Sequence, residues 1–243
     1  MEKERTEQNN TELLTTALNI TSYRLETSTN SQYQNEKFAE FQDLEEYQQN
    51  TTYLYPIALT GVLSESLFYQ AYSQIVGKDN IKPATGDEDL QGIDFYINGY
   101  PTDVTASNLS LTKKISTDRV PTIFLPKHTN QKNIFEHTSF NYNKNYIMQA
   151  IHKENIDNYQ YIQDTYNINK NILKQIEQNP QITPKAGTNN LTNMKVILTI
   201  LDQSLASFSK LNNKSASPSV ANLGCKSDPI YVADNLDCNN LPS

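Results

Sequence analysis

The chain has 243 residues, of which 37% are hydrophobic and seven are glycine, and its formal net charge is −7. This length allows one large domain or a domain with appendages, whereas the acidic balance argues against a uniformly basic nucleic-acid-binding protein. So few glycines nearly exclude a phosphate-cradling loop, and the sequence contains no P-loop or dinucleotide-binding motif.

The N-terminal part of the chain predicts two helices that follow a polar segment. Residues 1–34 are polar and charged, with one weak helical run, so we expect a polar arm or a short helix there. Apolar side chains recur every three residues from Asn35 to Gln49, which predicts an amphipathic helix. A longer helical pattern runs from Tyr55 to Val76 and ends before Gly77.

Glu65 lies in the middle of this longer helix, beside or within its apolar face. A charged side chain is rare in such a place unless it is paired or binds a metal. The alternative is a glutamate at the boundary of the face that reaches solvent. The sequence leaves both readings open.

A β-hairpin is predicted after residues 78–90, which we expect to form a loop. The dipeptide Asn98-Gly99 between alternating apolar residues favours a two-residue type I′ turn. Counting outward from this turn places Asp94 opposite Asp103 at a non-hydrogen-bonded pair, where Cα atoms are roughly 4.5 Å apart. Like charges in such a pair are destabilising, so the two carboxylates share a proton, hold a cation or are exposed and solvated.

The rest of the chain predicts one strand and several helices. Residues 107–118 connect the hairpin to a third strand at 120–125, and the Asn/Ser-rich residues from 212 onward read as a flexible tail. The helices that we predict in this part cover 142–152, 159–178 and 191–211. We divide the chain into a polar arm (1–34), an α/β core (35–135), a helical part packing on the core (136–211) and the tail (212–243).

A basic segment directly follows the hairpin. Residues 104–135 contain five lysine and arginine residues and a single acidic one. Such a segment is typical of a phosphate-contacting surface, although ordinary solvated lysines explain it equally well. The candidate phosphate contacts are Lys113, Lys114, Arg119 and Lys127.

A helix with Glu65, a strand with Asp94, a tight turn, a strand with Asp103 and a further strand follow one another over residues 55–126. This series resembles the core of the PD-(D/E)xK nuclease superfamily, whose fold is restriction-endonuclease-like. The resemblance implies an α/β fold, with a mixed-sheet core flanked by helices and additional C-terminal helices. It also implies that Glu65, Asp94 and Asp103 bind Mg²⁺ or Mn²⁺ as catalytic residues and that DNA is the substrate.

Thr105 departs from the family pattern, because it stands where the family has a lysine that orients the attacking water. Either a relocated lysine such as Lys113 or Lys114 takes this catalytic role, or the chain does not cleave. The function predicted first is a Mg²⁺-dependent DNA endonuclease. The alternatives are a catalytically silent nuclease-fold protein that binds nucleic acid or a protein partner, and an unrelated acidic interaction protein. The sequence leaves a homodimer open.

The compartment is also an expectation from sequence. No run of 18 apolar residues predicts a membrane span, and the N-terminal residues MEKERTEQNN lack the apolar core of a signal peptide. We therefore expect a cytoplasmic protein, bacterial or phage-encoded, with no membrane partner. Without a secretion signal, Cys225 and Cys238 are expected to stay reduced, and a disulfide between them is the alternative.

Overall fold

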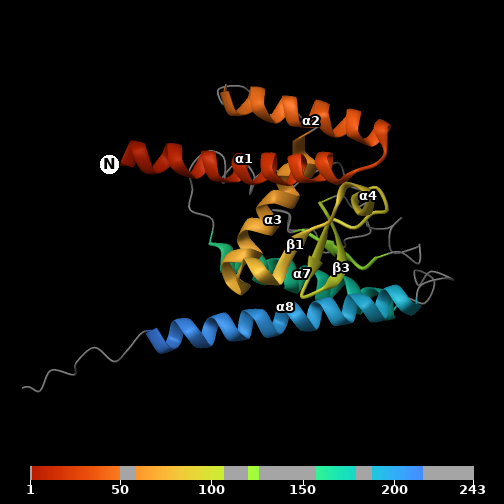
Figure 1. The fold of residues 1–243 in the computed structure, drawn as a ribbon. Helices are drawn as coiled ribbons and strands as arrows, with labels where there is room; N and C mark the ends of the chain where they lie inside the picture. Colours follow the sequence, from red (N-terminus) through yellow and green to blue (C-terminus); the bar gives the residue numbers. More distant parts are fainter. Residues whose placement is uncertain (1, 50–58, 107–119, 126–156, 179–187, 216–243) are drawn as a thin grey trace, which may run out of the picture.

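The computed structural model describes residues 2–49, 59–106, 120–125, 157–178 and 188–215 as an α/β protein with a four-stranded mixed sheet and six helices (Figure 1). Helices α1 and α2 run side by side on one side of α3 and the sheet, and α7 and α8 lie on the other side. In chain order the elements are α1 (Glu2–Thr27), α2 (Ser31–Gln49), α3 (Thr60–Val76), the 3₁₀ helix η2 (Lys78–Asn80), β1 (Ile81–Pro83), α4 (Gly86–Asp89), β2 (Phe95–Ile97), β3 (Tyr100–Thr105), β4 (Thr122–Phe124), α7 (Asn158–Gln178) and α8 (Thr188–Ser215).

The sheet has the strand order β1-β2-β3-β4, in which the first three strands are antiparallel and β4 is parallel to β3. The predicted hairpin is confirmed, since Ile97 pairs with Tyr100 across a two-residue turn. Asn98 and Gly99 have φ values of 50° and 82°, as a type I′ turn requires. The local sequence was therefore sufficient to set this register.

Helix α3 lies at the centre of the hydrophobic core. It is buried on most of its circumference, which suits a helix with so many apolar positions. The Phe68 ring stacks on Tyr72 and also contacts Phe95 of β2, so this helix packs directly on the sheet. Helices α1, α7 and α8 all contact α3, and together they bury it.

Helix α7 is fixed to the edge strand β4 by one buried amide. The side chain of Asn169 accepts a hydrogen bond from the Phe124 N–H and donates one to the Phe124 carbonyl, each at 2.8 Å. An edge strand exposes unpaired backbone groups, and a side chain that pairs with them covers that edge. The amide thus supplies the backbone partners that a fifth strand would otherwise provide at this residue.

Several predicted elements are confirmed, and two segments contain more regular structure than predicted. Helices α2, α3, α7 and α8 and strand β4 occupy the predicted regions. Where we expected a polar arm or a short helix, the structure has the 26-residue helix α1, which buries Leu13, Leu14, Ala17 and Ile20. The loop predicted over residues 78–90 contains η2, β1 and α4.

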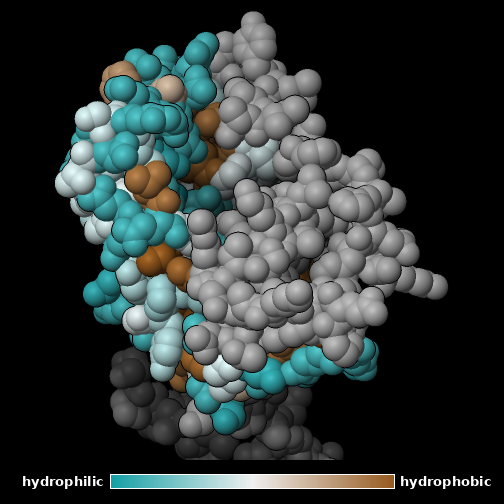
Figure 2. All heavy atoms as spheres, turned by 90° about the vertical axis from the view of Figure 1, so that its right-hand side faces the viewer, coloured by the Kyte–Doolittle hydropathy of each residue, from teal (hydrophilic) through white to brown (hydrophobic). Residues whose placement is uncertain are grey.

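Some expectations lie outside the described residues. They are the connecting segment 107–118, the helix at 142–152 and the tail beyond residue 215. Where the structure is described, the face shown in Figure 2 is mainly hydrophilic, with hydrophobic side chains gathered along the border of the grey atoms. Within the same residues, none of the helices has the combination of length and apolar character that crossing a membrane requires.

Candidate functional site

Three carboxylates from three elements converge beside the N-terminal helices. Glu65 comes from the middle of α3, Asp89 from the end of α4, and Asp94 from the residue before β2. One ligand oxygen from each lies within 4.8 Å of the others. Carboxylate oxygens at such separations are the donor set that Mg²⁺ and Ca²⁺ prefer. We call Glu65, Asp89 and Asp94 the acidic triad.

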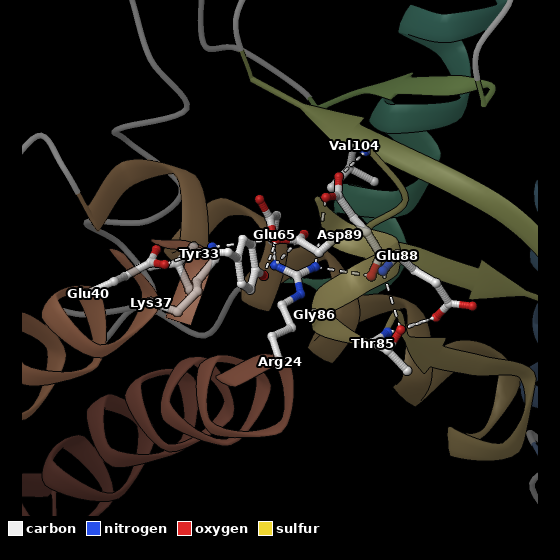
Figure 3. A network of polar contacts seen from close by, with 12 residues as sticks. Arg24, Tyr33, Lys37, Glu40, Glu65, Thr85, Gly86, Glu88, Asp89 and Val104 are labelled. Atoms are coloured by element: carbon white, nitrogen blue, oxygen red, sulfur yellow. Dashed lines mark hydrogen bonds and ion pairs between the residues drawn. The ribbon is translucent and has the colours of Figure 1, made fainter. Parts of the chain in front are cut away.

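Arg24 of α1 points toward Glu65 and Asp89 (Figure 3) and contacts all three members of the acidic triad. Its Nη1 is 2.7 Å from Glu65 Oε2 and 3.1 Å from Asp89 Oδ1. Its Nη2 donates to the Asp94 carbonyl at 3.1 Å and is 3.8 Å from Asp94 Oδ1. The side chain is only 1% exposed. Arg24 therefore ties the N-terminal helix to the other three elements.

Charge keeps this buried guanidinium protonated. Burial by itself lowers the pKa of Arg24, but the nearby carboxylates of Glu65, Asp89 and Asp94 outweigh burial and raise it. Its Nε, however, is buried and has no hydrogen-bond partner among the described residues. The guanidinium carbon also lies 5.9 Å from the centre of the Phe95 ring.

Asp94 does not occupy the predicted cross-strand pair with Asp103. The ladder between β2 and β3 ends at Phe95 and Thr102, and Asp94 Oδ2 instead accepts the Val104 N–H at 2.6 Å. Both aspartates are buried, with exposures of 7% and 2%, which excludes the alternative that they are exposed and solvated. Burial, followed by the charges of Glu65 and Asp103, raises the pKa of Asp94 well above its ordinary range.

The first three residues predicted for the site therefore have different outcomes. Glu65 is paired, as the first of its two readings required, and lies beside Asp94. Asp103 interacts electrostatically with Asp94, but it belongs to β3 opposite Thr122 of β4 and is not a member of the acidic triad. The structure thus groups Asp89 with Glu65 and Asp94, and the part of Asp103 in metal binding stays a prediction.

The basic candidates Lys113, Lys114, Arg119 and Lys127 lie outside the described residues, so their contacts remain predictions. Thr105 ends β3 and is half-buried. Sequence reasoning missed Arg24, although it continues the helical spacing of Ala17, Ile20 and Thr21 on the buried side of α1. It also missed Asp89, for which the run Asp87-Glu88-Asp89 gave no spacing that singled out one residue.

Helix α2 supplies the side chains on another flank of the acidic triad. The Tyr33 hydroxyl donates a hydrogen bond to Asp89 Oδ2, and Lys37 Nζ lies 3.7 Å from the same oxygen. Lys37 Nζ is also 2.8 Å from Glu40 Oε2, one turn further along α2. Figure 3 shows Tyr33, Lys37 and Glu40 together on the side of Arg24 opposite Thr85 and Glu88. Burial and the bond to Asp89 raise the pKa of Tyr33.

Helix α4 is fixed on two sides. The Thr85 side chain and Glu88 form a reciprocal capping box, and the Tyr96 hydroxyl donates to Glu88 at 2.7 Å. On its other side, Asp87 accepts hydrogen bonds from the backbone and side chain of Thr29, which lower its pKa. These contacts hold Asp89 at one position relative to α1.

Negatively charged side chains outnumber positively charged ones around the acidic triad. Each carboxylate interacts with at least one other member of the group, and two cations lie among them. The negatively charged members outnumber the positive ones by three when all are ionised. The group consists of Glu40, Glu65, Asp89, Asp94 and Asp103 with Arg24 and Lys37. A buried surplus of negative charge favours either protonation or a bound cation.

Gly86 lies where α4 packs closely against α1. A Cβ at this position would lie 2.1 Å from the Arg24 carbonyl oxygen and 2.6 Å from Ser28 Cβ. We expect Gly86→Ala to lower the free energy of unfolding by about 1–3 kcal/mol in urea titrations, because backbone must move to admit the methyl group. The control Gly61→Ala, where a Cβ meets nothing within 4 Å, should not destabilise the protein. Equal stabilities of the two variants would contradict this close packing.

Comparison with known proteins adds no relative. No protein-family model matches this chain, and no curated protein or solved structure is significantly similar to it.

Proposed function

We propose that this protein is a divalent-metal-dependent endonuclease that hydrolyses phosphodiester bonds in DNA. The observation that carries the proposal is the acidic triad, whose ligand oxygens lie within 4.8 Å of one another. In this proposal Glu65, Asp89 and Asp94 bind Mg²⁺ or Mn²⁺. An ion held there would supply the activation of a water molecule and the stabilisation of charge on the leaving oxygen.

The order of elements supports this class of enzyme. The helix with Glu65 precedes an antiparallel series of three strands, and the chain then reaches β4, which is parallel to β3. This arrangement, a mixed sheet with flanking helices, is compatible with the proposed restriction-endonuclease-like core. The same resemblance makes Asp103 a further ligand of the metal in this proposal. Its charge acts on Asp94, as expected of a carboxylate near the acidic triad.

The presence of Arg24 is compatible with a bound ion. A carboxylate has about four lone-pair positions, so an oxygen that accepts from Arg24 keeps further acceptor capacity. The five carboxylates of the region also exceed its two cations, Arg24 and Lys37, by more than one divalent ion would neutralise. A bound Mg²⁺ or Mn²⁺ would therefore reduce the buried negative charge without reversing its sign.

A catalytically silent nuclease-fold protein is the second candidate. Two observations favour it: Thr105 has no charge, and Arg24 already partly neutralises the acidic triad. Under this alternative the protein would bind nucleic acid or a protein partner without cleaving. Lys113 and Lys114 are the relocated cations that the active enzyme could use, and separate alanine variants of each would decide their part in cleavage.

Metal binding and cleavage provide the test. Millimolar Mn²⁺ should raise the Tm of the native protein, because a ligand that binds only the folded state stabilises it. Glu65→Gln should remove this rise and stop the cleavage of plasmid DNA, since the amide has the same shape without the charge. Glu45→Gln, on the exposed side of α2, is the matched control and should behave as the native protein.

The two candidates give different results in this experiment. A Tm rise that Glu65→Gln removes, without any cleavage by the native protein, would favour the silent alternative. If Mn²⁺ leaves the Tm of the native protein unchanged, the acidic triad does not bind a metal and the proposal fails.

A further inference from the structure

We propose that Lys37 of α2 contacts the scissile phosphate, and that Glu40 is the partner which holds Lys37 when no substrate is bound. This inference rests on the proposed function. It assigns the substrate-binding cation to an N-terminal helix, outside the segment that carries the resemblance to nucleases.

The need for another cation follows from the burial of Arg24. Its side chain is 1% exposed, and both terminal nitrogens already contact Glu65, Asp89 and Asp94. A phosphodiester could reach it only by displacing these partners. Thr105, the residue at the position where the sequence pattern expects a cation, has no charge to offer.

Lys37 has the exposure and position that Arg24 lacks. Its side chain is 19% exposed, and its Nζ lies 3.7 Å from Asp89 Oδ2, at the edge of the acidic triad. A phosphate that binds at the Asp89 side of the acidic triad would therefore also meet the ammonium group of Lys37. Two positive charges at one phosphate stabilise the additional negative charge of the transition state.

The turn of α2 that precedes Lys37 is held in place by hydrogen bonds of Tyr33. The hydroxyl of Tyr33, one turn earlier in α2, donates a hydrogen bond to Asp89. The backbone N–H of Tyr33 donates one to Asn30 Oδ1 at 2.9 Å. Lys37 Nζ lies 5.5 Å from the centre of the Tyr33 ring. Two carboxylates, Glu40 at 2.8 Å and Asp89 at 3.7 Å, lie around the ammonium group and hold it in place.

Glu40 gives Lys37 a partner that a substrate can replace. The Nζ–Oε2 distance of 2.8 Å joins residues three apart on one helix, and such pairs contribute little to helix stability. An ammonium group has three donors, so a phosphate oxygen can share Nζ with Glu40 or take its place. Removing the Glu40 charge should therefore free Lys37 for the phosphate.

The experiment compares Lys37→Met, Lys37→Arg, Glu40→Gln and the control Lys82→Met, whose lysine is exposed on β1. Hydrolysis of bis(p-nitrophenyl) phosphate and of plasmid DNA with Mn²⁺ reports on cleavage. We expect Lys37→Met to lose about 10²–10³ in rate, as when one oriented electrostatic partner is removed, and Lys37→Arg to recover part of it. Lys82→Met should retain the native rate.

Two further measurements separate a substrate contact from a structural role. The Mn²⁺-dependent rise in Tm should persist in Lys37→Met, because the acidic triad is intact. The slope of log affinity against log salt for a 20-base-pair DNA duplex, measured in EDTA, should decrease by about 1 in Lys37→Met. Glu40→Gln should bind the same duplex more tightly than the native protein.

Each opposing result overturns the inference. If Lys37→Met cleaves at the native rate, Lys37 does not contact the scissile phosphate. If the variant no longer shows the Mn²⁺-dependent rise in Tm, Lys37 has a structural role instead. A loss of duplex binding in Glu40→Gln would show that the Lys37–Glu40 pair only maintains the fold. If the native protein cleaves nothing, the proposed function fails separately, and an unchanged salt slope in Lys37→Met then overturns the phosphate contact.

Discussion

Replacing Arg24 by methionine should lower the free energy of unfolding by about 3–5 kcal/mol, because removing one partner of a buried ion pair leaves uncompensated charge. Arg24 is 1% exposed and contacts Glu65, Asp89 and Asp94, so three elements lose their common partner at once. Methionine retains much of the apolar stem, which limits the packing loss. Urea unfolding in EDTA measures the effect.

The control for this variant is an ion pair of the same length on the surface. Lys195 Nζ is 2.7 Å from Glu177 Oε1, but the two side chains are 56% and 46% exposed. Lys195→Met should therefore cost less than about 1 kcal/mol. If Arg24→Met costs no more than this control, the guanidinium does not hold the helices together. Arg24→Lys provides the same comparison should the methionine variant not fold, since lysine keeps the charge without the planar fork.

Manganese extends this experiment to the acidic triad. In Arg24→Met the carboxylates of Glu65, Asp89 and Asp94 lose their guanidinium, and a divalent ion is the cation that can replace it. We therefore expect Mn²⁺ to raise the Tm of Arg24→Met by more than it raises the Tm of the native protein. An equal or smaller rise would mean that the ion and Arg24 do not act on the same carboxylates.

The parts of the fold that sequence predicted are those in which local rules suffice. The Asn98-Gly99 turn requires positive φ at two adjacent residues, and few other dipeptides supply them. The helices α2, α3, α7 and α8 carry apolar side chains at helical spacing. Helix α1 was missed because its apolar side chains are few and its polar ones many, so its burial depends on contacts with α2 and α3 that the pattern does not contain.

The candidate site shows the same division between local and long-range information. Glu65 and Asp94 were identified because each is a charge within an otherwise apolar element. Arg24 and Asp89 are brought together by packing across 65 positions of the chain, and no local rule relates them. The predicted pairing of Asp94 with Asp103 failed for a local reason, since the Asp94 side chain accepts the Val104 N–H where a further ladder bond would lie.

Asp94→Asn should make the protein more stable and less active at the same time. Burial, Glu65 and Asp103 raise the pKa of Asp94, so the folded protein holds this carboxylate at a cost in stability when it is ionised. Asparagine removes the charge and keeps an oxygen that can accept the Val104 N–H. In EDTA, a gain of about 1 kcal/mol would raise the Tm of a chain of this size by about 2–4 °C.

The pH dependence of this difference has a defined sign. A carboxyl group whose pKa is higher in the folded than in the unfolded state stabilises the protein at low pH and loses that contribution as the pH rises. The native protein and Asp94→Asn should therefore have similar stabilities near pH 4, and the variant should become the more stable one as the pH increases. Asp79→Asn, which changes an exposed aspartate of η2, is the control and should show no such divergence.

Activity should change in the opposite direction. Asp94 is one of the three proposed ligands, so Asp94→Asn should lose the Mn²⁺-dependent rise in Tm and reduce cleavage of plasmid DNA by about 10²–10³ or more. If Asp94 had only a structural role, the substitution would lower the stability of the protein. If its charge is needed for a metal, removing that charge raises the stability of the metal-free protein. A variant that is less stable than the native protein in EDTA at neutral pH would place Asp94 among structural groups, held by Val104 and Arg24. A variant that is more stable and still cleaves would show that the metal does not depend on this carboxylate, and the acidic triad would lose its buried member.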